Sequence, residues 1–119
     1  MKKIEVGDVL QGAAKVLEKN EWTTCALACD THGEEIDPKD DEAVGFCVMG
    51  AIERCLFDNM LNPSYADHVA EAVNNYCTDL PYYNDFIAQT KQEVQDFLLE
   101  IAETFEARTP IEQFDRYLT

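Results

Sequence analysis

The segment FCVMGAIERC, residues 46–55, carries the pattern on which the predicted fold depends. Apolar and small side chains recur through it at three- and four-residue spacing, which is typical of one face of an α-helix. The members of this stripe are Val44, Cys47, Val48, Ala51, Ile52 and Cys55. The sequence therefore predicts a helix here, with Cys47 on its buried face.

This helix is expected to begin well before Cys47. Asp37 precedes Pro38, and proline is tolerated in the first turn of a helix, where its missing N–H would have no partner anyway. Acidic side chains follow at residues 40–42, where they would face the positive end of the helix dipole. The pattern thus predicts a helix N-terminus near Asp37.

Four further helices are predicted from capping residues that precede an apolar period. Asp8 with Gln11 and Thr90 with Glu93 have the spacing of a capping box, and Asn62 stands before a proline. The four predicted helices span residues 8–20, 63–77, 91–107 and 109–118.

Two segments break the helical period. Residues 22–36 surround a THG turn and are expected to form a short β-hairpin or an extended loop. Residues 78–85, TDLPYYND, are expected to be irregular, because the residue before a proline is biased away from the helical region. The sequence therefore predicts a mostly α fold of about five helices with one small β element.

The composition fits a cytoplasmic protein with a single domain over residues 1–119. Its 119 residues are 46% hydrophobic, which is enough for one compact core. No apolar run is long enough for a signal peptide or a membrane span. The five cysteines are odd in number and lie in apolar stretches, which argues against a disulfide framework and for a reducing compartment.

The charge limits the class of partner. The chain has 24 acidic against 9 basic side chains, a formal net charge of −15. Such a chain lacks the clustered cations that bind nucleic acid or an anionic membrane surface. High net charge keeps a protein soluble, and it also suits a basic protein partner.

Two acidic surfaces could meet such a partner. One is the segment EEIDPKDDE, residues 34–42, in which Lys39 is the single base. The other is the outer side of the helix predicted over residues 91–107. Its four carboxylates recur at helical spacing and are Glu93, Asp96, Glu100 and Glu103. Either set can also be read as an ordinary solvated face.

Cys47 has a structural interpretation and a catalytic one. A thiol packed in an apolar stripe has a raised pKa and is inert. A nucleophilic thiol would need a position near a helix N-terminus and a base within reach, for which His32 and His68 are the available histidines. The structural interpretation is preferred, so no catalytic residue is assigned, and the chain is taken as non-enzymatic.

Metal and nucleotide chemistry find little support. Cys25, Cys29 and His32 have a spacing that could place soft zinc ligands in a hairpin, but a fourth ligand would have to come from afar. No glycine-rich phosphate loop, GxSxG or HExxH motif is present in the sequence. We therefore expect no metal and no cofactor.

Several stretches together resemble a set of short uncharacterised proteins of bacteria and bacteriophages that is catalogued as a domain of unknown function. The stretches are EW at 21–22, AVGFCVMGAIER at 43–54, YYND at 82–85 and TKQEVQDFLLEIAE at 90–103. The resemblance covers roughly residues 8–105, and it departs at Tyr83, where tryptophan is expected. The positions that carry it are Trp22, Cys47, Gly50, Ala51, Asn84 and Asp85.

The resemblance implies a mostly helical fold and a bacteriophage setting, and it implies no particular chemistry. Cys47 with Asn84 and Asp85 could form an unusual cysteine site. The simpler interpretation is that Gly50 and Ala51 allow a close helix approach, while Asn84 and Asp85 bond to free backbone N–H groups.

The leading functional hypothesis is a small acidic binding protein, a bacteriophage accessory factor that binds or inhibits a basic host protein through an acidic surface. The alternative is a cysteine-dependent enzyme centred on Cys47. A third hypothesis, a sponge for a small signalling molecule, ranks lowest because only Lys91, Arg108 and Arg116 offer positive charge near the C-terminus.

Overall fold

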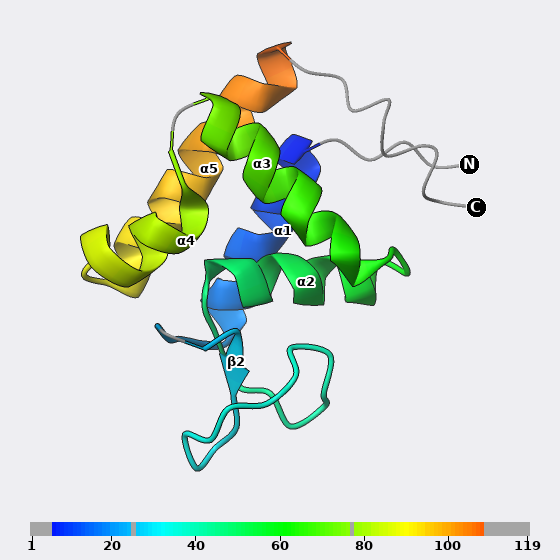
Figure 1. Cartoon of the computed structure of the whole chain (residues 1–119), viewed down its shortest axis with the longest axis vertical. Helices are drawn as coiled ribbons and strands as arrows, with labels where there is room; N and C mark the ends of the chain where they lie inside the picture. The colour runs from blue at the N-terminus through cyan, green and yellow to red at the C-terminus, as the bar shows by residue number, and fades with distance from the viewer. Residues whose placement is uncertain (1–5, 25, 77, 109–119) are drawn as a thin grey trace.

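The computed structural model describes residues 6–24, 26–76 and 78–108 (Figure 1). Most of them are helical, which confirms the predicted fold class. The helices are α1 (Val6–Lys19), α2 (Val48–Asp58), the 3-10 turn η1 (Pro63–Tyr65), α3 (Ala66–Tyr76), α4 (Leu80–Tyr82), the π-helical turn η2 (Tyr83–Ile87) and α5 (Lys91–Arg108). The strands are β1 (Glu21–Trp22), β2 (Ala28–Cys29) and β3 (Gly45–Phe46).

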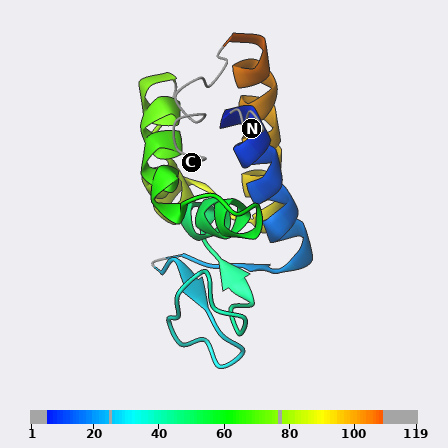
Figure 2. The ribbon, with the colours of Figure 1, turned by 90° about the vertical axis from the view of Figure 1, so that its right-hand side faces the viewer.

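The helices enclose one apolar core. α1 lies along α5, α3 stands on the other side, and α2 crosses between them at the base (Figure 2). The small sheet and the loops around it extend beyond α2, away from the helices (Figures 1 and 2). The apolar periods of α1 and α5 face this core, with Leu10, Leu17 and Leu98 fully buried. Burying a leucine contributes about 1.5–3 kcal/mol, so these faces fix the packing.

The second helix begins at Val48, so the prediction of a start near Asp37 is wrong. The aspartates of that segment cap local turns instead. Asp37 Oδ1 accepts a hydrogen bond from the Lys39 N–H at 2.8 Å, and Asp40 Oδ1 accepts one from the Glu42 N–H at 2.9 Å. An aspartate can stabilise such a turn as well as a helix cap. The cap-and-proline pattern therefore did not distinguish the two.

The β element is a three-stranded sheet in the order β1-β3-β2. β3 pairs in parallel with β1, with Trp22 opposite Phe46, and antiparallel with β2, with Ala28 also opposite Phe46. A small β element was predicted, but its central strand lies in the segment predicted to be helical. Within residues 22–36 the only antiparallel pairing of described residues is the bridge between Cys29 and Glu35, across a turn with Gly33 at φ 78°.

Of the other predicted helix starts, two are confirmed and one is wrong. Asn62 Oδ1 caps η1 through the Ser64 N–H at 3.0 Å, and Thr90 Oγ1 caps α5 through the Glu93 N–H at 3.1 Å, as predicted. α1, however, already includes Val6, so Asp8 lies inside its first turn. The helix predicted over residues 109–118 falls outside the described residues.

The segment predicted to be irregular, residues 78–85, is largely helical. Asp79 Oδ1 accepts a hydrogen bond from the Tyr82 N–H at 2.9 Å and so starts α4. Pro81 lies in the first turn, where it removes no helical hydrogen bond. Leu80, the residue before the proline, is itself the first residue of α4, so the expected bias away from the helical region is not followed here and the prediction of an irregular segment is wrong.

None of the helices in residues 6–24, 26–76 and 78–108 combines the length and the apolar content that a membrane span requires.

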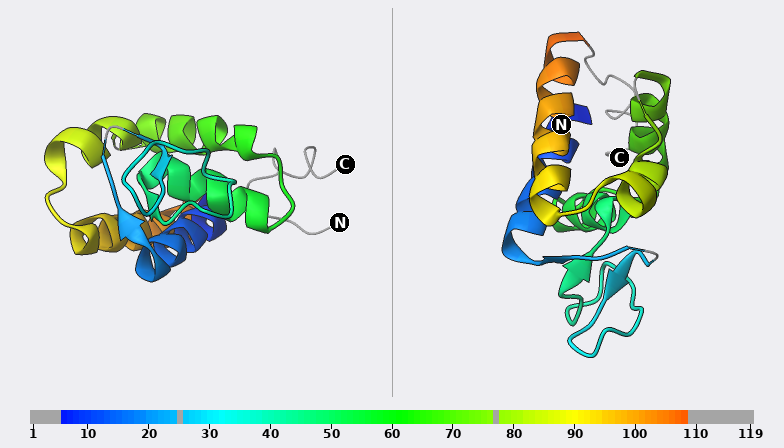
Figure 3. Two further views of the ribbon diagram at one scale, coloured as in Figure 1. Left: turned by 90° about the horizontal axis from the view of Figure 1, so that it is seen from below. Right: turned by 90° about the vertical axis from the view of Figure 1, so that its left-hand side faces the viewer.

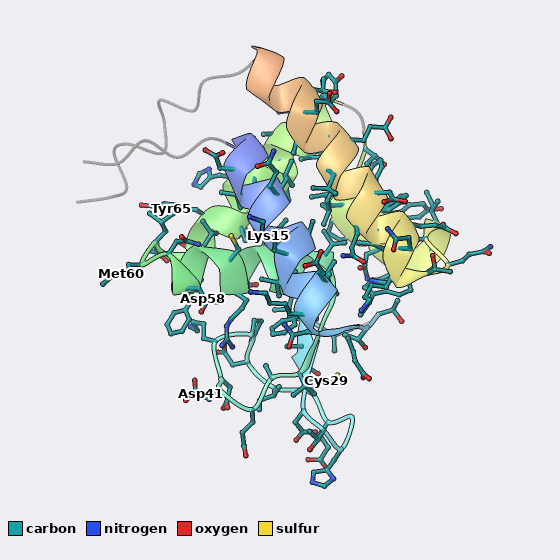
Figure 4. The ribbon with its side chains drawn as sticks, turned by 180° about the vertical axis from the view of Figure 1, so that it is seen from behind. Lys15, Cys29, Asp41, Asp58, Met60 and Tyr65 are labelled. Atoms are coloured by element: carbon teal, nitrogen blue, oxygen red, sulfur yellow. The ribbon has the colours of Figure 1, made fainter. Side chains whose placement is uncertain are left out.

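Met60 provides a stability test. It follows α2 with φ 63°, in the left-handed region, and its side chain is 94% exposed at the edge of the molecule (Figure 4). A non-glycine residue in this region costs about 1–2 kcal/mol. We expect Met60→Gly to be more stable than Met60→Ala by about 1 kcal/mol, measured by urea unfolding. Equal stability of the two variants would show that the left-handed backbone conformation at position 60 carries no strain.

Candidate functional site

Asn84 is the hub of the candidate site. It is 1% exposed, and it is the one buried polar side chain among the residues whose burial is described. Its Oδ1 accepts hydrogen bonds from Trp22 Nε1 at 2.7 Å and from the Val48 N–H at 2.9 Å. Its Nδ2 donates to the Thr23 carbonyl at 3.3 Å and to Asp85 Oδ1 at 2.8 Å. Both donors and both acceptor positions of the amide are therefore used, as a buried amide requires.

These bonds join three parts of the chain that are far apart in sequence. Trp22 lies in β1, Val48 begins α2, and Asn84 lies in η2. The first N–H groups of a helix have no partner within it, and Asn84 supplies one for α2. The short sheet and the π-helical turn are thereby fixed against the start of α2.

Cys47 is the N-cap of α2. Its backbone is extended, with φ −82° and ψ 177°, and its Sγ accepts a hydrogen bond from the Gly50 N–H at 3.3 Å. Cys47 therefore precedes the helix on which it was predicted to lie. The side chain is nonetheless buried, at 8% exposed.

The electrostatic surroundings of Cys47 disfavour its thiolate. Burial raises the pKa of the thiol above its ordinary value, and the negative charges of Asp85 and Glu53 raise it further. The backbone N–H groups of Gly50 and Met49 act in the opposite direction but are outweighed. A reactive thiol needs a lowered pKa, so the position at a helix N-terminus does not activate this one.

Gly50 and Ala51 belong to the same structure. The Leu27 carbonyl accepts a hydrogen bond from the Cys47 N–H at 3.1 Å, and a Cβ on Gly50 would overlap that carbonyl. The close approach predicted at Gly50 is thus present, but it is made by the loop before β2 and not by another helix. Ala51 is fully buried one position further on.

A cleft opens beside this cluster. It has a volume of about 320 Å³ and is lined by Ala26, Leu27, Glu35, Cys47, Met49, Pro81, Asn84 and Asp85. Its walls are mostly apolar, and Glu35 and Asp85 contribute carboxylates. Sequence reasoning missed this cleft, because its lining comes from four separate segments.

The cleft lacks a base suited to activating the thiol. Neither histidine is among the lining residues. His32 is exposed in the turn before Gly33, and the ring of His68 lies 6.0 Å from that of Tyr65 in η1. Asp85 lines the cleft, but its negative charge opposes the thiolate. The arrangement suits the binding of a side chain better than nucleophilic catalysis.

The carboxylates predicted for partner binding lie elsewhere. Glu93, Asp96, Glu100 and Glu103 are exposed on α5, opposite its buried residues. Tyr83 stacks on Phe97 of this helix, with ring centroids 4.0 Å apart. Burial raises the pKa of Tyr83, and three of the carboxylates, those of Glu93, Asp96 and Glu100, raise it further. The negative potential of α5 therefore reaches the edge of η2.

The metal-ligand candidates are not brought together in the described structure. Cys25 lies outside the described residues, Cys29 is half-buried against Gly45, and His32 is exposed. Within residues 6–24, 26–76 and 78–108, no group of three His, Cys, Asp or Glu side chains is arranged to hold an ion.

A larger cavity of about 490 Å³ lies between α1 and α2. Lys15 and Asp58 line it from these two helices, as Figure 4 shows, together with Cys55. Burial raises the pKa of Cys55 to about 11. None of the residues that carry the sequence resemblance lines this cavity, so it is less informative about function than the smaller cleft.

Fold and site together define a small acidic helical protein built around a buried asparagine. Comparison with family profiles matches residues 1–104 to a family of unknown function, DUF6197. The chain belongs to this family, and the resemblance to an uncharacterised family is confirmed. A search of curated proteins found no match, and neither did a search of solved structures.

The role of Asn84 can be tested by unfolding. In Asn84→Ala the Trp22 Nε1–H and the Val48 N–H lose their buried acceptor, at about 1–3 kcal/mol for each unsatisfied group. We expect a loss of about 2–5 kcal/mol in the free energy of unfolding. The matched control is Asn75→Ala on the exposed side of α3, which should change it by less than about 0.5 kcal/mol. Similar effects of the two substitutions would refute the hub role.

Thiol labelling tests the state of Cys47. At neutral pH we expect native Cys47 to react with iodoacetamide much more slowly than half-buried Cys29, because its thiolate is disfavoured by burial and by Asp85. Peptide mapping by mass spectrometry assigns the sites, and urea-unfolded protein provides the fully reactive control. Fast, selective modification of Cys47 at neutral pH would support the enzyme hypothesis instead.

Proposed function

We propose that this protein is a non-enzymatic binding protein that occupies a surface of a basic protein, with the outer face of α5 as its contact surface. The observation that carries the proposal is the exposure of Glu93, Asp96, Glu100 and Glu103 along one side of a single long helix. Their spacing of three and four residues keeps them on neighbouring turns, about 5–6 Å apart.

The core-facing side of α5 holds this acidic face in place. Val94, Leu98 and Ala102 are fully buried against the rest of the protein, so the helix is a rigid support. The ion pairs recorded among the described residues join Lys39 to Asp37 and Arg54 to Asp58, and neither involves α5. Glu93 accepts a hydrogen bond from the Gln89 N–H at 3.4 Å and Asp96 accepts one from Gln92 Nε2 at 2.9 Å, but neither donor is charged. The charges of the α5 carboxylates can therefore attract the cations of a partner, which would accelerate association and make it sensitive to salt.

The segment 34–42 is less suited to this role. Asp37 and Asp40 use side-chain oxygens in local turns, and Lys39 lies 3.7 Å from Asp37. Arg54 also donates to the carbonyls of Pro38 and Asp40, at 3.1 and 3.0 Å. Two cations therefore offset part of the charge of the six carboxylates in this segment, which favours α5 as the contact surface.

The proposal includes a setting. Binding or inhibiting a host protein in the bacterial cytoplasm, as an accessory factor of a bacteriophage, would fit a short chain of net charge −15. The hypothesis of an enzyme centred on Cys47 has less support because of the raised thiol pKa. The sponge hypothesis also has less support: Lys91 Nζ already donates to the Asn20 carbonyl at 3.0 Å.

Affinity capture from a bacterial lysate tests the proposal. Immobilised protein should retain a basic protein at low ionic strength and release it at about 0.5 M salt, where charges are screened within a few ångströms. In the variant Asp96→Asn/Glu100→Gln/Glu103→Gln the retained amount should fall several-fold. Glu93 is left unchanged because its carboxylate accepts a hydrogen bond from a backbone group, the Gln89 N–H ahead of the helix, at 3.4 Å, whereas the Asp96 carboxylate accepts one from a side chain, that of Gln92, at 2.9 Å.

The control removes the same charge elsewhere. Glu18→Gln/Asp67→Asn/Glu71→Gln neutralises three exposed carboxylates on α1 and α3. Capture should be close to that of the unaltered protein. Equal losses in the two triple variants would show an effect of net charge alone and would contradict a contact surface on α5.

A further inference from the structure

The segment that holds Asn84 presents an apolar surface to solvent on its other side. Tyr82, Phe86 and Ile87 are 55%, 74% and 50% exposed, and we call these three residues the aromatic ledge. The rings of Tyr82 and Phe86 lie 5.1 Å apart, so the ledge has a continuous aromatic part. Figure 3 shows α4 and the turn that follows it at one end of the molecule, beyond the body of the helices.

The ledge stands on a rigid support. The Ala88 N–H bonds to the Tyr83 carbonyl at 2.9 Å, the five-residue pattern of a π-helical turn, which occurs frequently at functional sites. Asn84 fixes this turn to β1 and α2, and Tyr83 stacks on α5. A backbone that is already fixed lowers the conformational entropy lost when its side chains bind a partner.

The cleft of about 320 Å³ adjoins the ledge. Pro81 and Asp85, which line the cleft, directly precede Tyr82 and Phe86 in the chain. The two pairs therefore occupy neighbouring faces of one helical segment. The cleft offers apolar walls from Leu27 and Met49, with the carboxylates of Asp85 and Glu35. The aromatic ledge beside an acidic cleft favours a ligand that carries both an apolar group and a positive charge.

We propose that the ledge and the cleft form a docking site for a segment of a partner protein that carries an arginine or lysine beside a large apolar residue. The apolar residue packs on Phe86 and Tyr82, and the cation enters the cleft toward Asp85 and Glu35. Charge complementarity selects this occupant, since the cleft carboxylates and the net charge of −15 both favour a cationic segment. The inference shares with the proposed function the basic class of partner, but it uses a different surface from α5.

A titration with defined peptides tests the docking site. The probe is a synthetic peptide of alternating arginine and leucine with a central phenylalanine, and an oligolysine of equal charge lacks its apolar residues. Amide NMR shifts of the ¹⁵N-labelled protein should change with the first peptide at Leu27, Glu35, Met49 and residues 81–87. Oligolysine should instead shift the amides of α5.

The variant Phe86→Ser should weaken binding of the first peptide about ten-fold or more, since truncating a central aromatic contact has this cost. Phe57→Ser is the matched control, because Phe57 is 43% exposed on α2, and it should leave the affinity unchanged. Both phenylalanines are on the surface, and thermal unfolding confirms that each variant is folded.

The outcomes separate this inference from the proposed function. Oligolysine shifts on α5 without any shift in the cleft would overturn the docking site and leave the acidic face of α5 supported. Equal affinity of Phe86→Ser and the unaltered protein would also overturn it. If sedimentation shows self-association that Phe86→Ser abolishes, a second copy of the chain occupies the ledge, and the proposed occupant is wrong.

Discussion

The structure depends on the hydrogen bonds of one buried amide. Asn84 accepts from the indole of Trp22 and from the first N–H of α2, and it donates to the Thr23 carbonyl and to Asp85. Leaving the buried amide of Asn84 without its partners would cost about as much free energy as the hydrogen bonds contribute. Its burial is therefore favourable only when β1, α2 and η2 are packed together. It thereby specifies how the sheet, α2 and the π-helical turn are placed relative to one another.

This constraint gives the cysteine its place and limits its chemistry. Cys47 follows β3 in an extended conformation and caps α2, whose first N–H, that of Val48, donates to Asn84 Oδ1. The same packing buries most of the thiol at the edge of the cleft, and with Asp85 nearby the neutral form is favoured. The helix N-terminus, which would stabilise a thiolate in the open, is outweighed by burial. Asn84 and Cys47 therefore hold β1, α2 and η2 together from the inside of the protein.

The two candidate contact surfaces consist of side chains that this packing leaves exposed. α5 packs its apolar stripe on α1 and leaves its carboxylates outside, while the turn around Asn84 leaves Tyr82 and Phe86 outside. The exposed carboxylates could be predicted, because the 3.6-residue period of α5 separates apolar from acidic positions. The ledge could not, because residues 78–85 gave no helical period from which to assign faces. The cleft required the meeting of residues as distant as Leu27 and Asp85.

The sequence by itself determined the mostly helical class, the buried stripes of α1 and α5, the caps at Asn62 and Thr90, and the acidic character of the surface, since these depend on local periodicity, capping chemistry and composition. Only the tertiary structure decided that residues 45–46 become the central strand and that α2 starts at Val48. By spacing alone, Val44 and Cys47 fit the apolar stripe of a helix as well as the residues that do lie in α2. That local preference was outweighed by two contacts with distant segments. β3 pairs with β1 and β2, and Asn84 Oδ1 accepts the hydrogen bond of the Val48 N–H.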